Sequence, residues 1–225
     1  MKLRSWSVLF CSLVGGLGAA QAQAVGNITD APFSALWVTK TASATGIDFT
    51  AIDVARSKDG SVYRAQRKDG RLQWIEIVDV LNERRISLSL VRNICEVTPP
   101  SGRPQWVVRT LAQQRAVLER MQANFEKGFD RKSPELSKHE TALGTKVRDG
   151  MEIFGHHYLE TRNKDGSLVS EGDTWQTDLG FVVSQTWTDH ERTITSVMEG
   201  IRREEPDPKL FQLPATCTLP KETNH

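Results

Sequence analysis

Histidine and cysteine are the residue types of this chain most often used in metal sites and nucleophilic catalysis. His156 and His157 are adjacent, and His139 and His190 lie apart from them. Neighbouring residues on a β-strand point to opposite faces, so the adjacent pair cannot bind one metal ion together in regular strand geometry. No H-x-H or H-E-x-x-H pattern supplies a second ligand. The spacing therefore predicts no metal site, with one of the two imidazoles half-buried and the other exposed.

Other signatures of catalysis are missing from the sequence as well. It contains no Gly-x-Ser-x-Gly run, no phosphate-binding glycine loop and no dinucleotide fingerprint. Acidic residues are plentiful, but many occupy turns, as Asp59, Asp69 and Asp165 do, where carboxylates hydrogen-bond to the backbone. The pattern leaves a paired-carboxylate site open without singling one out. We expect no catalytic residue, no cofactor and no enzymatic activity, and a hydrolase is the less favoured alternative.

The first 24 residues have the layout of a secretory signal peptide. A basic start precedes an apolar run over Trp6–Ala20, and small residues then alternate with glutamine up to Ala24. Cleavage is expected after Ala24, with the bond after Ala22 as the alternative, which leaves 25–225 as a single mature domain. A membrane anchor is disfavoured because the apolar run is short and glycine-rich.

The charge balance excludes several partners. Loss of the leader removes Lys2 and Arg4 from 29 basic residues, which leaves 27 against 28 acidic residues and a net charge near −1. Such a chain, taken as a whole, has no electrostatic drive toward nucleic acid or anionic lipid headgroups. No other segment approaches the roughly 18–20 apolar residues that span a bilayer, so no transmembrane anchor is expected after cleavage. The expected location is the periplasm or the extracellular space.

The cysteines fit an oxidising compartment. Cys11 leaves with the leader, and Cys95 and Cys217 remain. An even pair favours one disulfide over two free buried thiols, which are the alternative. A Cys95–Cys217 bond would tie the C-terminal tail to the N-terminal half and close a loop of about 120 residues.

Turn signals and apolar alternation predict most of the architecture. Asp-Gly, the strongest local hairpin signal, occurs at 59–60, 69–70, 149–150 and 165–166. Strands are expected over 33–90, and again from Thr145 to near Ile201. Leu72–Asp79 is apolar on both faces, which predicts a sheet covered on both sides there.

The segment from Gln105 to Phe125 changes to a helical period. One stripe carries Val107, Leu111, Leu118, Met121 and Phe125, and Gln114 interrupts it. This predicts one amphipathic helix that covers the sheet. Residues 130–139 are expected to form a charged connector. The fold class is therefore α+β, a largely antiparallel meandering sheet with one substantial helix packed on it.

A proline-rich segment follows the second group of strands. Glu205–Pro208 cannot join a central strand ladder, because proline lacks the backbone donor. We expect this segment to carry Leu210, Phe211 and Leu213 across the surface as a closing clasp.

The last third of the chain resembles a large group of uncharacterised, secreted bacterial proteins that end in an E-P-D-P-x-L-F-x-x-P segment. The shared pattern lies at 143–145, 149–150, 155, 160–162, 171, 174–175, 178–180 and 201–214. This resemblance implies no activity. More distantly, the layout of a meander with a helix resembles the half-barrel of outer-membrane lipoprotein carriers, whose concave, curved sheet holds acyl chains under a helical lid. That resemblance is one of fold, and function does not follow from fold alone.

Tryptophan is the remaining candidate for recognition. Trp37, Trp74, Trp106, Trp175 and Trp187 follow the leader, and such side chains line both cores and ligand grooves. A core position is the favoured interpretation for each. If a groove exists, the residues expected to line it are Trp74, Trp175, Trp187 and Leu118.

The sequence thus favours an exported, non-enzymatic binding or scaffold module of the bacterial envelope. In its sharpest form this module holds an apolar small molecule or lipid on the concave face of the sheet. The alternative is a surface-acting protein-interaction, sensor or assembly factor whose partner is another envelope protein.

Overall fold

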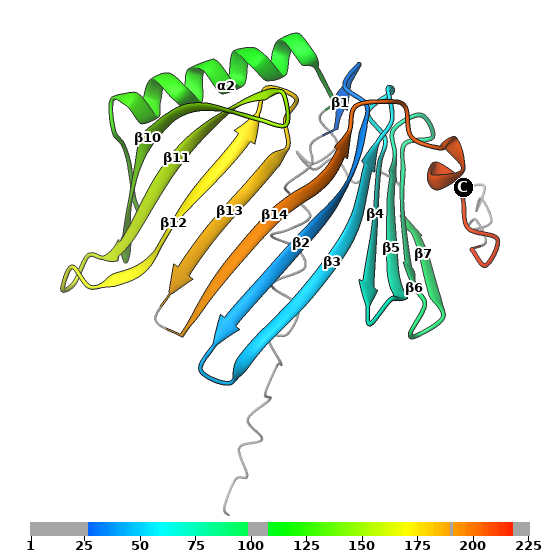
Figure 1. Cartoon of the computed structure of the whole chain (residues 1–225), viewed down its shortest axis with the longest axis horizontal. Coiled ribbons are helices and arrows are strands. Elements are labelled where there is room, and N and C mark those ends of the chain that lie inside the picture. The colour runs from blue at the N-terminus through cyan, green and yellow to red at the C-terminus, as the bar shows by residue number, and fades with distance from the viewer. Residues whose placement is uncertain (1–26, 99–107, 190, 218–225) are drawn as a thin grey trace, which may run out of the picture.

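One curved antiparallel sheet forms most of the molecule (Figure 1). The computed structural model describes residues 27–98, 108–189 and 191–217. The expected leader, Trp106, Val107 and His190 lie outside these residues. The expected α+β class is confirmed. The strands of the sheet are β2 (Phe33–Ser43), β3 (Gly46–Arg56), β4 (Val62–Lys68), β5 (Arg71–Asp79), β6 (Arg84–Ser89), β7 (Ile94–Thr98), β9 (Phe129–Lys132), β10 (Leu136–Arg148), β11 (Met151–Arg162), β12 (Leu168–Thr177), β13 (Val182–Asp189) and β14 (Arg192–Arg202).

The first strand of this sheet, β2, and its last strand, β14, lie side by side in its middle. The strand order is β7-β6-β5-β4-β3-β2-β14-β13-β12-β11-β10-β9. The first half meanders outward from β2 to β7, and the second half meanders back from β9 to β14. The halves join where Trp37 of β2 pairs with Met198 of β14. Within the described residues β7 and β9 remain edges, so the sheet is a half-barrel rather than a closed barrel.

Asp-Gly turns set the register of the meander as expected. Gly60, Gly70, Gly150 and Gly166 all have positive φ, between 69° and 91°. At two of these turns the aspartate is left-handed as well, with φ of 51° at both Asp69 and Asp149. Two consecutive left-handed residues are what a two-residue hairpin turn with the twist of its strands requires.

Helix α2 (Leu111–Glu126) begins later than the sequence pattern predicted. The two residues before it, Arg109–Thr110, form strand β8, which pairs in parallel with β1 (Ile28–Thr29). Thr110 then starts the helix with a capping box: its hydroxyl accepts the backbone N–H of Gln113, whose side chain accepts the N–H of Thr110. Figure 1 shows α2 lying across one end of β10 and β11.

The prediction of a charged connector over residues 130–139 was wrong. Residues Phe129–Lys132 form β9, which pairs with residues 137–140 of β10 (Leu136–Arg148). An edge strand can carry charges along its length, since one of its sides faces no other strand. The many charged residues are therefore the reason that the sequence pattern did not predict strands in this segment.

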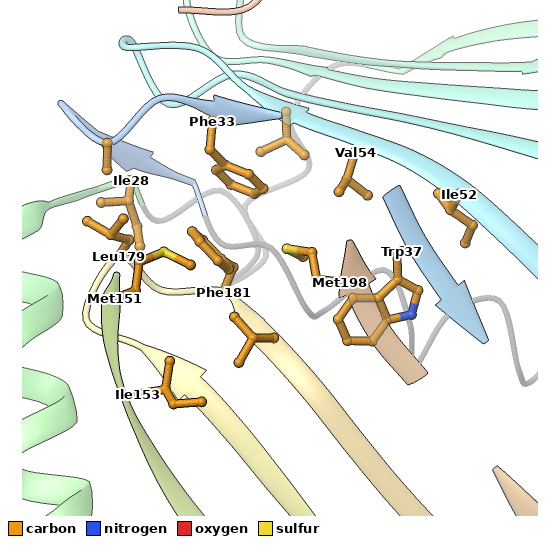
Figure 2. Close-up of a cluster of buried hydrophobic side chains, with 13 residues drawn as sticks. Ile28, Phe33, Trp37, Ile52, Val54, Met151, Ile153, Leu179, Phe181 and Met198 are labelled. Atoms are coloured by element: carbon orange, nitrogen blue, oxygen red, sulfur yellow. The ribbon is translucent and has the colours of Figure 1, made fainter. Parts of the chain in front are cut away.

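The main core joins both halves of the sheet at the end near α2 (Figure 2). The rings of Phe33 and Phe181 stack with centroids 4.3 Å apart. Figure 2 shows Trp37, Ile52 and Met198 continuing the same cluster. Because Phe33 belongs to the first strand of the sheet and Phe181 precedes β13, this core depends on contacts between distant parts of the sequence.

A buried cation closes this core. Arg56 has no exposed surface, and its guanidinium donates to the carbonyl oxygen of Ala31, at 2.8 and 2.6 Å, and to that of Leu179, at 2.7 Å. Burial lowers the pKa of Arg56 to about 9, so the group stays charged at neutral pH. Arg56 thereby ties the segment before β2 to the β12–β13 turn. The next residue of that turn, Gly180, has φ of +74°, and a Cβ there would lie 2.0 Å from the side chain of Ile28.

A second core lies on the opposite face of β5 and β6. It contains Ile77, Ile86 and Leu88, with Leu213 and Cys217 of the C-terminal tail packed over them. The expected coverage of β5 on both faces is confirmed, because Val78 of the same strand packs against the main core.

The C-terminal tail is held at several points. The 3-10 helix η2 (Pro208–Phe211) follows β14, and the Glu205 carboxylate accepts the backbone N–H of Lys58 at 3.0 Å. The expected disulfide is present: Cys95 of β7 is bonded to Cys217, with 5.4 Å between their Cα atoms. The expected closing clasp therefore exists and ends in a covalent bond to the edge strand.

Candidate ligand-binding face

Residues paired across adjacent strands share a face of the sheet, so the register identifies the inner face. One row runs from Met198 through Trp37, Ile52 and Gln66 to Trp74. A second row, two residues further along β2, runs from Thr39 through Ser196, Gln185 and Thr174 to His156. The ring of Phe125 in α2 stacks on His156, with centroids 4.5 Å apart. The helix therefore lies on the same face as Trp37, and we call this face the inner face.

The inner face changes from apolar to polar along the strands. Phe33 and Trp37 of β2 are buried in the main core near α2. The next residue on this face is Thr39, whose hydroxyl lies 2.9 Å from that of Ser196. Thr41 follows, and Ser43 ends the strand. The inner face is therefore apolar toward the helix and carries hydroxyl groups toward the opposite end.

Trp74 and Trp187 lie on the inner face, one in each half of the sheet. Trp74 is half-buried, and its indole N–H donates to the Ser87 hydroxyl at 3.2 Å. Trp187 is also half-buried and pairs with Gly172 on one side and Ile194 on the other. The row of Trp187 reaches Thr41 through Ile194, which fixes its side of the sheet.

The other two residues expected to line a groove are packed against protein. The ring of Trp175 covers Gly155, where a Cβ would come within 2.8 Å of it, and the Lys146 ammonium lies 3.4 Å from the ring centroid. Leu118 is only 5% exposed on α2. The structure thus brings Trp74 and Trp187 to one face and places Trp175 and Leu118 in packed positions.

A buried charge network, which sequence analysis missed, lies on the inner face of β4, β5 and β6. The Arg64 guanidinium contacts one carboxylate oxygen of Glu76 at 2.6 Å, and Arg85 contacts the other. Glu76 is 1% exposed. Burial lowers the pKa of Arg64, and the attraction of Glu76 opposes that shift. A signal for this network was present in the sequence, because two neighbouring strands each carry a charged residue at a position that faces inward. These residues, Arg64 and Glu76, pair across the Asp69-Gly70 hairpin.

A second polar group lies on β10 and β11, on the inner face. The Lys138 ammonium is 2.7 Å from the Glu140 carboxylate and 4.8 Å from the centroid of the Tyr158 ring. Glu140 pairs with Tyr158 in the register. Burial, with Glu160 and Asp173 nearby, raises the pKa of Tyr158, so its hydroxyl remains protonated at neutral pH. Sequence analysis missed Lys138 because it placed that residue in a connector.

The adjacent histidines occupy opposite faces, as strand geometry predicts. His156 lies under Phe125, whereas the Nδ1 atom of His157 is 2.8 Å from the Asp173 carboxylate. His139 pairs at 2.6 Å with Asp130. In residues 27–98, 108–189 and 191–217, no group of three His, Cys, Asp or Glu side chains is arranged to hold a metal ion.

His156 gives a pH-dependent prediction. Burial lowers its pKa below the ordinary value of 6.5; Glu140 and Asp173 oppose this shift, and Lys138 and His157 add to it. The neutral imidazole is therefore favoured in the folded state, and its contribution is complete above pH 6.5 and lost as the pH falls toward the lowered pKa. We expect His156→Phe to reduce the fall in unfolding midpoint between neutral and acidic pH. Denaturant titrations of both proteins test this, and an unchanged fall would contradict it.

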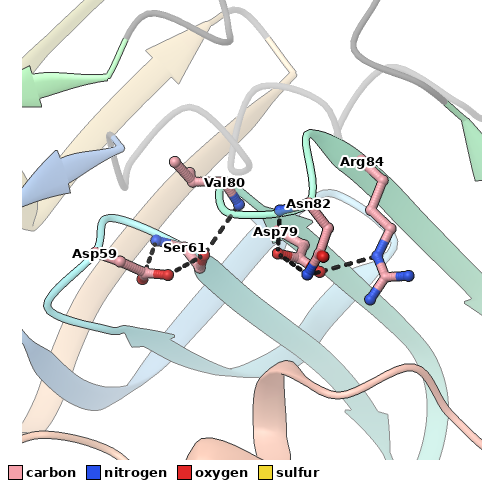
Figure 3. Close-up of polar contacts among 6 residues, drawn as sticks. All are labelled: Asp59, Ser61, Asp79, Val80, Asn82 and Arg84. Carbon is pink, nitrogen blue, oxygen red and sulfur yellow. Dashed lines mark hydrogen bonds and ion pairs between the residues drawn. The ribbon is translucent and has the colours of Figure 1, made fainter.

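Several carboxylates organise turns, as the sequence suggested (Figure 3). Asp59 accepts the backbone N–H of Ser61 at 3.0 Å and its hydroxyl at 3.1 Å, while that hydroxyl accepts the N–H of Val80 at 3.0 Å. Asp79 accepts the backbone N–H of Asn82 at 3.1 Å and the Arg84 Nε–H at 2.8 Å. These contacts join the β3–β4 and β5–β6 turns, so both carboxylates have structural partners.

Comparison with known proteins identifies no family. No protein-family model matches the sequence, and no curated protein matches it significantly. The solved structures that resemble it include a LolA superfamily protein from Nitrosomonas europaea, with 8% identity, a TM-score of 0.37 and coverage of 87% of this chain and 97% of that one. Lipoprotein LppX from Mycobacterium tuberculosis has 10% identity, a TM-score of 0.35 and coverage of 78% and 91%, respectively.

A third similar structure is a beta-barrel-like protein from Brucella abortus that represents a domain of unknown function. It has 8% identity and a TM-score of 0.38, with coverage of 79% of this chain and 99% of that one. At identities and TM-scores of this size, the likeness identifies neither a ligand nor an activity for this chain.

Among the described residues, no helix has the length and apolar character to cross a membrane.

Proposed function

We propose that this protein is an exported, non-enzymatic binding module of the bacterial envelope that holds an apolar or lipid ligand against the inner face of its half-barrel. The observation that carries this proposal is the placement of Trp74 and Trp187. Both rings are half-buried on the inner face, one in each half of the sheet. Tryptophan in such a position offers a large apolar surface with a polar edge, which suits a ligand groove.

The gradient along the inner face supports an amphiphilic ligand. The apolar side chains of Trp37, Ile52 and Met198 lie toward α2, and the hydroxyls of Thr39 and Ser196 lie beyond them. Burial of an apolar chain against the half-buried rings of Trp74 and Trp187 is favourable by about 25 cal/mol for each Å² removed from water. The leader predicted from the sequence would deliver the protein to the compartment where such ligands occur.

Quenching of tryptophan fluorescence tests the proposal. The probe is dibrominated stearic acid, whose bromine atoms quench an indole that they contact. The protein exported with its own leader should be quenched in a saturable manner, and Trp74→Phe together with Trp187→Phe should remove most of that quenching. Trp37→Phe is the matched control, because Trp37 is 3% exposed in the core.

Native mass spectrometry of the exported protein supplies a second measurement. A co-purifying lipid is expected. A protein that carries no lipid and shows no saturable quenching would contradict the proposal. Repeated recovery of one protein partner in place of lipid would favour the surface-acting alternative.

A further inference from the structure

Exposed apolar side chains are concentrated at one end of the sheet. Of the ten exposed large apolar residues in the part of the chain that the structure describes, five belong to two turns and their flanking strands. Val91 is 72% exposed, Phe49 63% and Ile47 60%. We call these five the apolar rim: Ile47, Phe49, Leu90, Val91 and Ile94.

The antiparallel order of the strands places the apolar rim at the end opposite α2. The turns β2–β3, β4–β5 and β6–β7 alternate with the turns at the helix end, so all three lie together (Figure 1). Ile47 and Phe49 follow the first of these turns, and Leu90, Val91 and Ile94 surround the third. The hydroxyl end of the inner face opens toward the same side.

The β2–β3 hairpin extends beyond its neighbour on one side. Pairing of β3 with β4 begins only at Ala51, opposite Arg67. Residues 46–50 of β3 are therefore paired with β2 but not with β4. The two apolar side chains in this stretch, Ile47 and Phe49, project where β4 does not cover them.

Basic residues accompany the apolar rim. Lys40, Lys68, Arg71 and Arg92 are all exposed at or near these three turns. Lys40 pairs directly with Phe49 across the hairpin. The exposed acidic residues nearest to them are Asp48, Asp69 and Glu96, which the four basic residues outnumber. The surface thus combines protruding apolar groups with a net positive charge, although the whole chain is nearly neutral.

We propose that the apolar rim docks the protein on an anionic lipid bilayer. The apolar side chains insert at the level of the headgroups, and the four basic residues contact lipid phosphates. A protein partner fits less well, because the apolar residues stand on separate turns instead of forming one contiguous patch of the roughly 800 Å² that each side of a stable interface buries. Docking at this end would turn the open end of the inner face toward the membrane. Such docking does not depend on the identity of any bound ligand.

Sedimentation with vesicles tests the docking surface. The protein recovered after export is mixed with vesicles of phosphatidylcholine alone or of phosphatidylcholine with phosphatidylglycerol. We expect binding to the anionic vesicles at low salt, with weaker binding at high salt and to neutral vesicles. The double variant Ile47→Ser, Phe49→Ser should bind the anionic vesicles at least about tenfold more weakly, because apolar area contributes to interfacial binding.

Two exposed residues at the helix end provide matched controls. Leu81 is 76% exposed in the β5–β6 turn, and Val147 is 75% exposed next to the β10–β11 turn. Leu81→Ser together with Val147→Ser should leave vesicle binding unchanged. Equal loss of binding in the rim and control variants would overturn the proposal, as would a lack of binding to anionic vesicles. Capture of a protein partner through the rim without vesicle binding would overturn it as well.

Discussion

Leu118→Asp is expected to lower the free energy of unfolding by about 4 kcal/mol, because it combines the loss of a buried leucine with the burial of an unpaired carboxylate. Leu118 is 5% exposed in the middle of α2. Phe125, near the C-terminal end of the same helix, is also 5% exposed and stacks on His156. Both residues seal the helix to the inner face. Chemical denaturation of the exported protein and of the variant measures the change directly.

Ala116→Asp is the matched control for this prediction. Ala116 is exposed on the same helix, so the same charge there should change the stability by no more than about 0.5 kcal/mol. The alternative is that α2 is a movable lid. Leu118→Asp would then leave the unfolding midpoint almost unchanged and would alter only the uptake of the brominated fatty acid.

The regular parts of the fold were accessible from sequence because each rests on a local pattern. Asp69-Gly70 and Asp149-Gly150 predict two-residue hairpin turns, since such turns need two consecutive left-handed residues. The stripe through Leu118 and Phe125 identified the helix. Its start was misplaced because the residues before Leu111 pair with β1, a contact between segments far apart in the chain.

The interior polar groups were not accessible in the same way. Arg56 ends a strand in the sequence, and only the folded chain shows that its partners are the carbonyls of Ala31 and Leu179. Glu76 likewise lies within an apolar run, and its two arginine partners come from neighbouring strands. Such residues become recognisable only after the register is known, because register decides which side chains share a face.

The candidate site shows the same limit. The number of tryptophans indicated that their rings would lie either in the core or in a ligand groove. The sequence alone did not distinguish these two positions for any one tryptophan. The structure separates them: Trp74 and Trp187 lie half-buried on the inner face, whereas the ring of Trp175 packs on Gly155. Whether Trp74 and Trp187 contact a ligand is what the quenching experiment measures.

Removal of the disulfide is expected to have an effect of similar size to that of Leu118→Asp. The bond joins residues 122 positions apart. In the chain-entropy model, a crosslink that closes so long a loop stabilises the folded state by roughly 4–5 kcal/mol, since it restricts the unfolded chain. The double variant Cys95→Ser, Cys217→Ser should lose about this amount in chemical denaturation, and using both substitutions leaves no reactive thiol behind.

The loss should also appear locally, because the bond holds the tail over the second core. Cys217 and Leu213 cover Ile77 and Ile86, on the face of the sheet opposite α2. Once the bond is gone, we expect proteolysis to cut the tail after β14 before it cuts the rest of the sheet, and Leu213→Ala in the bonded protein is the control that weakens packing without releasing the chain. Peptide mapping of the exported, unreduced protein tests the premise. Two alkylatable thiols in the folded protein would contradict it, whereas a single crosslinked peptide pair would confirm the bond between the tail and the edge strand β7.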